Sequence, residues 1–305
     1  MIRERVLRAL AANREPGFHF AGNFCEVAFH RDGEGSRVTM APGIHNTGPD
    51  GHVDFSVLAM VADMALAASI RAGLDPRTRL ATVSMTLQMT GMPAVGSIEG
   101  RGRFEGFFGG GDSKQGLSRV VMTSGGKPIG FGHGAFMALE PPPGVQLFPM
   151  PGPDRPRARP LAEDELEPEE RELLQRADTI LADPQAEGDF LRHFLGILAR
   201  RTKAGATATM KNGAHVANRV GHVQGGLLAG FAAACASQAL PSRWSLSAIT
   251  ACFTSPGQGA VLRATSRVRH QGLMTAVVHT EVVGANRRRV LEAITTHARE
   301  AVVKT

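Results

Sequence analysis

The chain has 305 residues, of which 43% are hydrophobic and 20% charged; this is typical of globular rather than disordered proteins, and the length suits two domains of about 150 residues each. The net charge is +6, but the basic residues are scattered, only 5% of residues are aromatic and tyrosine is absent. Stacking surfaces for nucleobases are therefore scarce, and we expect small anionic ligands such as phosphorylated cofactors rather than nucleic acid.

The first half predicts one long apolar helix among short strands. A hairpin turn is expected at 124–128, where Gly-Gly and Pro separate two strand-like runs. The glycine-rich stretch 106–112 is a loop without the Gly-Lys-Ser/Thr of a phosphate-binding loop. In chain order we expect helices at 2–12 and 54–72, and strands at 18–29, 36–40, 81–90, 97–107, 117–124 and 129–139.

Eight prolines fall within residues 140–160, which predicts a semi-rigid, extended linker over 141–160. The chain is thus expected to divide into one module at 1–140 and a second at 161–305. The second module predicts helices at 161–182, 189–200 and 224–240, a strand pair at 206–210 and 213–216, and four strands at 245–253, 260–269, 273–283 and 289–298.

Cysteine usage and the N-terminus indicate the compartment. Cys25, Cys235 and Cys252 lie far apart with no CxxC pair, which fits a reducing compartment and neither a disulfide framework nor a zinc site. The first ten residues form an amphipathic helix rather than a signal peptide, and no apolar run reaches the ~18 residues of a membrane span. We therefore expect a cytoplasmic protein with no metal and no membrane partner.

The two halves repeat features in the same order. Gly-His-Val occurs at 51–53 and 221–223; each copy is preceded by an asparagine, Asn46 or Asn218, and followed by an apolar helix. A strand-like run then follows, with a serine nine residues before a proline in both copies. The chain is therefore interpreted as one module used twice. A helix that is apolar on nearly every face must be wrapped, and an antiparallel sheet curled around it predicts an α+β fold.

The helix starting after Gln224-Gly225-Gly226 opens with a ligand-binding pattern. Paired glycines let backbone N–H groups approach a ligand, and a helix N-terminus directs unpaired N–H groups and a positive dipole end at it. This pattern suits a phosphate, a carboxylate or a developing oxyanion. An ordinary tight turn before a core helix explains the same glycines equally well.

Asp63 is the second candidate, because it is the only charged residue between Asp54 and Arg71. A lone carboxylate on an apolar helix must be paired, solvated in a pocket or protonated. Such a group is either a structural hydrogen-bond acceptor or a catalytic carboxylate.

This order, with Asn-x-x-Gly-x-x-(His)-Gly-Gly opening a central helix, resembles the hotdog fold, and most closely the acyl-CoA thioesterases of the phenylacetate-pathway (PaaI-like) type. The family motif places a His-Gly-Gly six residues after the asparagine and an acid nine residues after the histidine. Here Gln224 stands six residues after Asn218 in place of the histidine, and Ala233 stands where the acid is expected. In the first half Asp63 matches the acid, but Asp54-Phe55-Ser56 replaces His-Gly-Gly, and the loop after Asn46 is two residues longer.

In that family, modules pair helix to helix, and each site takes the Gly-Gly loop from one module and the acid from the other. The resemblance implies two tandem hotdog modules with one complete site, in which Asp63 faces the loop ending in Gly225-Gly226. The opposite pairing, of Asp54 with Ala233, would be idle. The implied activity is hydrolysis of a fatty or aryl acyl-CoA, with no cofactor beyond the coenzyme A of the substrate, in a homo-oligomer.

The resemblance also implies roles for single residues. Asp63 would act as general base for water or attack the thioester directly, while the Gly225 N–H would hold the oxyanion. Gln224 would add an amide donor or orient the substrate, and Ser84 would position water. Asn218 would fix the catalytic loop or contact substrate. The residues assigned to substrate binding are Gly226, Asn46 and Asp54.

Two other functions stay open. The missing histidine and second acid favour a non-catalytic acyl-CoA-binding or scaffold protein. Asp50-Gly51-His52 with Asp54 faintly resembles the Asp/His pair of MaoC-type hydratases. The loop histidines, at 45, 52, 215 and 222, have no metal-site spacing and are expected to form loop hydrogen bonds. A serine hydrolase is not expected, because no Gly-x-Ser-x-Gly elbow occurs.

Overall fold

The computed structural model describes residues 2–15, 19–32, 35–75, 77–110, 114–141, 143–144 and 152–299. The first half contains α1 (Ile2–Arg14), α2 (Phe20–Phe24), β1 (Ala28–Asp32), β2 (Gly35–Met40), α3 (Phe55–Arg71), β3 (Arg79–Met89), β4 (Ile98–Phe108), β5 (Gln115–Ser124) and β6 (Lys127–Leu139). The second contains α4 (Pro168–Leu181), α5 (Phe190–Leu195), β7 (Ala199–Thr202), β8 (Gly205–Lys211), α6 (Gly225–Gln238), β9 (Trp244–Phe253), β10 (Val261–Gln271), β11 (Thr275–Val283) and β12 (Arg289–Arg299). Short 3₁₀ turns occur at Glu163–Glu165, Pro184–Ala186 and Ala285–Arg287.

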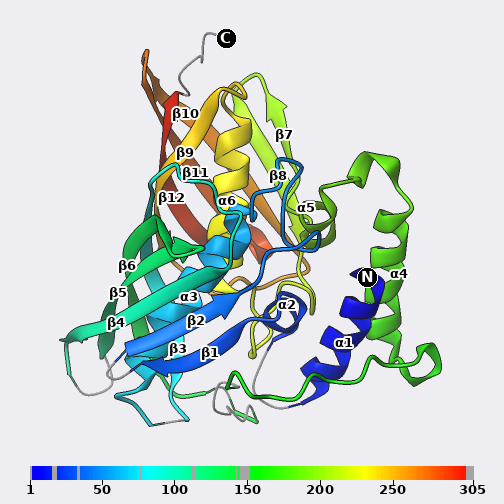
Figure 1. Ribbon diagram of the computed structural model, residues 1–305. Helices are drawn as coiled ribbons and strands as arrows, with labels where there is room; N and C mark the ends of the chain where they lie inside the picture. Colours follow the sequence, from blue (N-terminus) through cyan, green and yellow to red (C-terminus); the bar gives the residue numbers. More distant parts are fainter. Residues whose placement is uncertain are drawn as a thin grey trace.

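All strands belong to one twelve-stranded antiparallel sheet, in the order β1-β2-β4-β5-β6-β3-β9-β12-β11-β10-β8-β7 (Figure 1). The second half of this order repeats the first in reverse, so each half contributes the same arrangement. The seam is the β3–β9 pair, where Thr86 lies opposite Thr250 and their hydroxyls are 3.3 Å apart. The two modules are thus related by an approximate two-fold axis through this pair, as the repeated sequence features predict.

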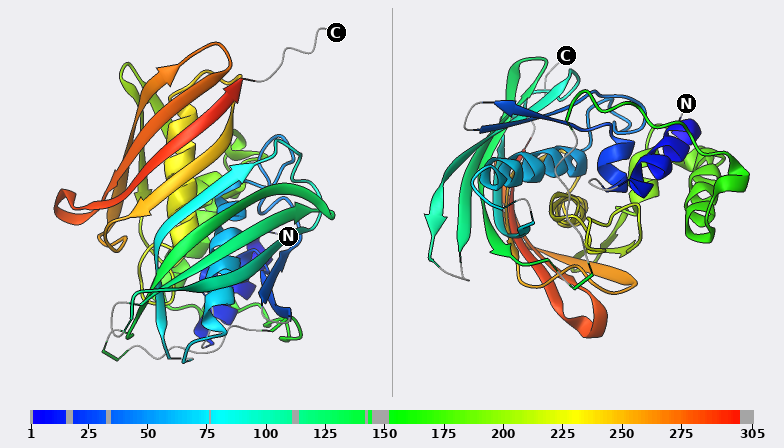
Figure 2. Two further views of the ribbon diagram at one scale, coloured as in Figure 1. Left: turned by 90° about the vertical axis from the view of Figure 1, so that its left-hand side faces the viewer. Right: turned by 90° about the horizontal axis from the view of Figure 1, so that it is seen from below.

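The sheet curves around two central helices, α3 and α6 (Figure 2). Both are buried over most of their surface, because almost every residue in them is apolar or small. They also pack on each other through glycines of α6. A Cβ on Gly226 would lie 2.5 Å from the Met60 Cα, and one on Gly230 would overlap the Ser56 backbone. The helix backbones therefore approach as closely as only glycine permits.

The short helices α2 and α5 seal the junction between the modules. Phe20 stacks on Phe24, Phe190 stacks on Phe194, and the rings of Phe24 and Phe194 lie 5.6 Å apart across the junction. Beyond them α1 packs beside α4, and Arg3 pairs with Asp178 at 3.0 Å (Figure 1). Helices α1 and α2 of the first half therefore pack against α4 and α5 of the second half.

Two predicted elements are wrong at this junction. The strand expected at 18–29 is α2 followed by β1; Phe18 itself lies outside the described residues. Phe20 and Phe24 are spaced for one face of a helix, and His19 caps it by accepting a hydrogen bond from the Gly22 N–H at 3.2 Å. The helix expected at 189–200 stops at Leu195 because Gly196 adopts a left-handed conformation with φ 71°.

Two further expectations need correction. The strand expected at 213–216 is a turn, and β8 pairs instead with β7 on one side and β10 on the other. The helix expected at 161–182 begins at Pro168, which occupies the first turn where its missing N–H costs nothing. Residues 142 and 145–151 of the predicted linker lie outside the described residues, and the module boundaries stay predictions. None of the helices in the described ranges is long and apolar enough to cross a membrane.

Candidate active site between the modules

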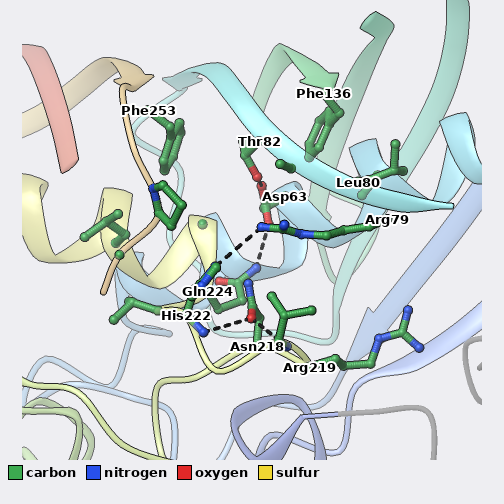
Figure 3. Close-up of a pocket in the computed structure, with 18 of the residues that line it drawn as sticks. Asp63, Arg79, Leu80, Thr82, Phe136, Asn218, Arg219, His222, Gln224 and Phe253 are labelled. Carbon is green, nitrogen blue, oxygen red and sulfur yellow. Dashed lines mark hydrogen bonds between the residues drawn. The ribbon is translucent and has the colours of Figure 1, made fainter. Parts of the chain in front are cut away.

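A buried carboxylate marks the contact between α3 and the start of α6. Asp63, in the middle of α3, is only 6% exposed. Its Oδ1 accepts a hydrogen bond from the Thr82 hydroxyl at 3.0 Å, and its Oδ2 accepts one from the Gln224 amide at 2.6 Å (Figure 3). Asp63 and Thr82 come from the first module and Gln224 from the second. The structure therefore brings the acid of one module against the glycine loop of the other.

Gln224 has two contacts that fix its amide. It is the N-cap of α6, where its Oε1 accepts from the Leu227 N–H at 2.8 Å. Its Nε2 must then point the other way, toward Asp63. Asn218 shapes the preceding loop, since its Oδ1 accepts from the backbone N–H groups of Val220 and His222 at 3.0 and 3.1 Å. The loop geometry that places Gln224 is thus held by the asparagine of the sequence motif.

The glycine pair lets this helix end meet the carboxylate directly. A Cβ on Gly225 would lie 2.7 Å from the Thr82 Oγ1 and 3.1 Å from the Asp63 Oδ1, so a side chain there would displace both. Gly225 is the first residue of α6, and its N–H has no acceptor within the helix. Gly226 donates its N–H to the Asp63 carboxylate, and its lack of a side chain also lets α6 pack on Met60 of α3.

The hydroxyl beside Asp63 belongs to Thr82 and not to Ser84, the residue expected from the sequence. Val83 forms a β-bulge between them, because the pairing of β3 with β6 shifts there by one residue. Met85 and Leu87 point to the core, and alternation alone would turn Thr82 outward. The bulge reverses that direction, so Thr82 points inward. Ser84 is not among the residues that line the cavity at this site.

Burial sets the acidity of the site. It raises the pKa of Asp63 from its ordinary value of 3.8 to about 6, while hydrogen bonds from Thr82 and from the Gly226 N–H oppose that rise. At neutral pH Asp63 is therefore mainly ionised yet more basic than an exposed carboxylate. Such a group can accept a proton near physiological pH.

A cavity of about 360 Å³ opens beside Asp63 and Gly225. Much of its lining is apolar and comes from α3, β3, β6, the N-terminal part of α6 and the end of β9: Met64, Ala67, Leu80, Val83, Phe136, Leu139, Leu228 and Phe253. Its size and mixed lining suit a small organic ligand with an apolar portion.

Three arginines also line this cavity, and the sequence patterns had pointed to none of them. Arg79 begins β3, and its guanidinium reaches the Nδ1 of His222 at 3.4 Å (Figure 3). Burial and the Arg79 charge lower the pKa of His222, which favours the neutral ring. Arg71 ends α3 and donates to the Thr78 carbonyl at 2.8 Å; Arg219 lies in the loop between Asn218 and Gln224. Scattered arginines carry no local sequence signal that would reveal their convergence.

The N-terminus of α3 is related by symmetry to that of α6, but different side chains surround it. Asp54 caps α3 by accepting from the Ser56 N–H at 2.8 Å, and its other oxygen pairs with Arg192 at 2.6 Å. Phe55 and Ser56 replace the glycine pair, and Ala233 replaces Asp63. Asp54 does not line the cavity, and its assignment to substrate binding stays a prediction that the structure does not support.

The contacts of Asn46 are with its own loop, and its assignment to substrate binding also stays a prediction. It is fully buried, its Oδ1 accepts from the Gly43 N–H at 2.8 Å, and its Nδ2 donates to the Ala41 carbonyl. The expected difference in loop length is also wrong. The bridges Thr47–Val53 and Ala217–Val223 are equivalent, so the two loops are equally long and Asn46 does not correspond to Asn218.

The loop histidines differ in their contacts. His45 and His215 are buried beneath the loops, and the Nε2 atoms of both have no hydrogen-bond partner among the described residues. His222 alone of the loop histidines lines the cavity. Within the described ranges no group of three His, Cys, Asp or Glu side chains is placed to hold a metal ion.

The fold and the joint site define a tandem pair of hotdog modules that share one sheet. No protein-family model and no curated protein matches the chain by sequence. Solved structures do match. A conserved protein with a hotdog fold from Alicyclobacillus acidocaldarius has 11% identity and a TM-score of 0.53, covering 90% of this chain and 97% of that one.

Two thioesterases have the same architecture. The tesB protein of Mycobacterium avium subsp. paratuberculosis has 10% identity and a TM-score of 0.52, covering 90% of this chain and 96% of its own. The 12:0-ACP thioesterase of Umbellularia californica has 11% identity and a TM-score of 0.52, covering 87% and 94%. At these identities the similarity establishes the fold, as the sequence resemblance predicted.

Proposed function

We propose that this protein is a thioester hydrolase acting on acyl-CoA, with a single site between its two modules. The observation that carries the proposal is the position of Asp63: a buried carboxylate with raised pKa, held by Gln224 and Thr82 against the first residue of α6, beside a cavity. The thioesterases that share the fold support the same reaction class. The carboxylate and the helix N-terminus supply the two groups that acyl transfer requires.

In the proposed reaction the thioester carbonyl oxygen lies toward the Gly225 N–H. Asp63 removes a proton from a water molecule, the water oxygen bonds to the carbonyl carbon, and the N–H stabilises the negative charge that develops on the carbonyl oxygen. The C–S bond then breaks, and the proton passes to the thiolate of coenzyme A. In the alternative route Asp63 attacks the carbonyl carbon itself, and the C–S bond breaks to release the coenzyme A thiolate. Water then hydrolyses the resulting anhydride, which regenerates the Asp63 carboxylate and supplies the proton for the thiolate. Both routes give a free acid and a thiol.

Gln224 has a defined part in either route. Its amide holds one oxygen of Asp63, while its other end is fixed by the Leu227 N–H. The carboxylate therefore keeps one orientation without a charged partner that would lower its basicity. Thr82 restrains the second oxygen in the same way.

The test is direct. Purified protein is incubated with a panel of short, medium, long and aryl acyl-CoA esters together with a thiol reagent. Thiol release that Asp63→Asn abolishes and Asp54→Asn preserves supports the proposal, because both carboxylates belong to α3 but only Asp63 lines the cavity. Saturable acyl-CoA binding without thiol release would instead establish the non-catalytic function.

The hydratase alternative has less support. Asp50 and His52 lie on an exposed turn, where the Asp50 carboxylate accepts from the His52 N–H at 3.0 Å. Neither residue lines the cavity, and Asp54 is paired with Arg192. The test measures the absorbance of a 2-enoyl-CoA incubated with the protein. If no water is added to the double bond, the hydratase function is excluded.

A further inference from the structure

The cavity beside Asp63 has an unusual charge balance. Arg71, Arg79 and Arg219 line it from the end of α3, the start of β3 and the loop before α6. Among the described residues that line it, the only carboxylate is Asp63, whose two oxygens already accept from Thr82 and Gln224. The described residues that line the cavity therefore include three arginines and a single carboxylate.

Two of these cations lie near each other. Burial, together with the charge of Arg71, lowers the pKa of Arg219 to about 10, so Arg219 remains charged at neutral pH. Arg71 is held in place by the Thr78 carbonyl, which neutralises no charge. Like charges in a partly buried site disfavour each other unless an anion lies between them. Arginine also presents a planar set of donors that suits carboxylate and phosphate.

Their position relative to Asp63 fits one extended ligand. Asp63, Ala67 and Arg71 are spaced four residues apart on α3 and all line the cavity. With a rise of 1.5 Å per residue, the Cα atoms of Asp63 and Arg71 are separated by about 12 Å along the helix. A thioester at Asp63 can therefore extend along this face of α3 and present a second group to Arg71.

Resting on the proposed function, we propose that Arg71 and Arg219 form an anion subsite of this cavity, which binds a negatively charged group of the thioester substrate. That group is either a carboxylate on the acyl portion or a phosphate of coenzyme A. Both sources offer oxygen acceptors to paired guanidinium groups. Arg79 is not part of this subsite, because its guanidinium contacts His222 and so links β3 to the loop before α6.

Three substrates distinguish the sources: the best acyl group found in the panel, carried on coenzyme A; the same acyl group on N-acetylcysteamine, which has no phosphate; and its ω-carboxy counterpart on N-acetylcysteamine. The variants are Arg71→Met and Arg219→Met, which keep an apolar stem and remove the charge. We expect KM to rise about 10- to 100-fold, the scale for losing hydrogen bonds to a charged group, on one anionic substrate. Any loss on the neutral N-acetylcysteamine ester should be much smaller than the loss on that anionic substrate.

A rise in KM confined to the coenzyme A ester identifies the phosphate, and one confined to the ω-carboxy ester identifies the carboxylate; both support the proposal. Arg71→Lys should recover part of the loss. Arg77→Met is the matched control, because the Arg77 side chain is 84% exposed and lies outside the cavity. Equal losses on all three esters, or none on any, would overturn the proposal.

A binding measurement separates this inference from the proposed reaction. Asp63→Asn protein is titrated calorimetrically with 3′,5′-ADP and with glutarate, with and without Arg71→Met. Binding of one ligand that Arg71→Met removes supports the subsite even if no thioester is hydrolysed. Failure of both ligands to bind while the arginines are intact would overturn the subsite even if hydrolysis is observed.

Discussion

The N-termini of α3 and α6 occupy related positions, yet the side chains around them differ. At α6, Gln224 and the glycine pair face a buried Asp63 and an open cavity. At α3, Asp54, Phe55 and Ser56 face Ala233, and an ion pair with Arg192 closes off the cap. The strands, the bulge and the loop bridges are preserved on both sides. The scaffold thus tolerates full loss of the polar site, so the chemistry is not what holds the helices in place.

The largest difference between the two helix ends should appear on replacing their carboxylates. Asp63→Asn keeps the shape and removes the base or nucleophile, so kcat should fall by about 100-fold or more. The measurement is steady-state thiol release from the best acyl-CoA. Circular dichroism of the variant should match the parent, since asparagine can still accept from Thr82. A kcat within threefold of the parent would assign the reaction to another group.

The pH dependence sharpens the comparison, because the pKa of Asp63 is raised to about 6. Protonation removes the base, so kcat/KM should fall about tenfold per unit as the pH drops below about 6. The contribution of Asp63 to stability should change in the opposite direction. A folded-state pKa above the unfolded value favours folding at low pH, and this contribution is lost as the pH rises through about 6. It should appear in urea unfolding as a difference between the parent and Asp63→Asn that changes between pH 4 and pH 8, because the buried histidines give both proteins the same, opposite pH dependence.

The bulge on β3 predicts unequal effects for two hydroxyls two residues apart. Thr82→Val keeps the volume but loses the hydrogen bond to Asp63, so kcat should fall about tenfold, the scale of one hydrogen bond to a charged group. Ser84→Ala should leave turnover unchanged, because Ser84 does not line the cavity. If Ser84→Ala proved the more damaging change, the direction of both side chains would be wrong.

The smallest effect on turnover is expected at the opposite helix end. Asp54→Asn keeps the cap of α3 and loses only the ion pair with Arg192, whose side chain is 44% exposed. Turnover should not change, and the free energy of unfolding should fall by about 1 kcal/mol. Chemical denaturation with a parallel thiol-release assay tests both. A loss of activity without a loss of stability would mean that the second helix end also takes part in the reaction.

Much of the architecture followed from local patterns. Apolar helices without a polar face required a wrapped environment, and the repeated loop-helix-strand order predicted the paired modules. The spacing that matched Asp63 to one motif and Gln224 to the other also predicted which side chains meet. These features depend on residue order, which a sequence contains directly.

The remaining features of the site depend on geometry that no repeating pattern in the sequence indicates. A single bulge at Val83 decides that Thr82 and not Ser84 faces Asp63. Asn46 and Asn218 look equivalent in sequence, but the loop bridges pair different positions. The three arginines of the cavity come from separate elements and converge only in the folded chain. The homo-oligomer, the cytoplasmic location and the module boundaries stay predictions.

The seam between β3 and β9 matters while the chain is being made. When the first module leaves the ribosome, β9 has not yet been synthesised, and the β3 edge that later pairs with it, Ser84–Gln88, presents unpaired N–H and C=O groups. The side of α3 that later contacts Gly226 and Gly230 is uncovered at the same time. A nascent first module can therefore join through β3 to the same edge of another nascent chain, giving a mispaired species that competes with folding. Slow synthesis of the second half should increase aggregation for this reason.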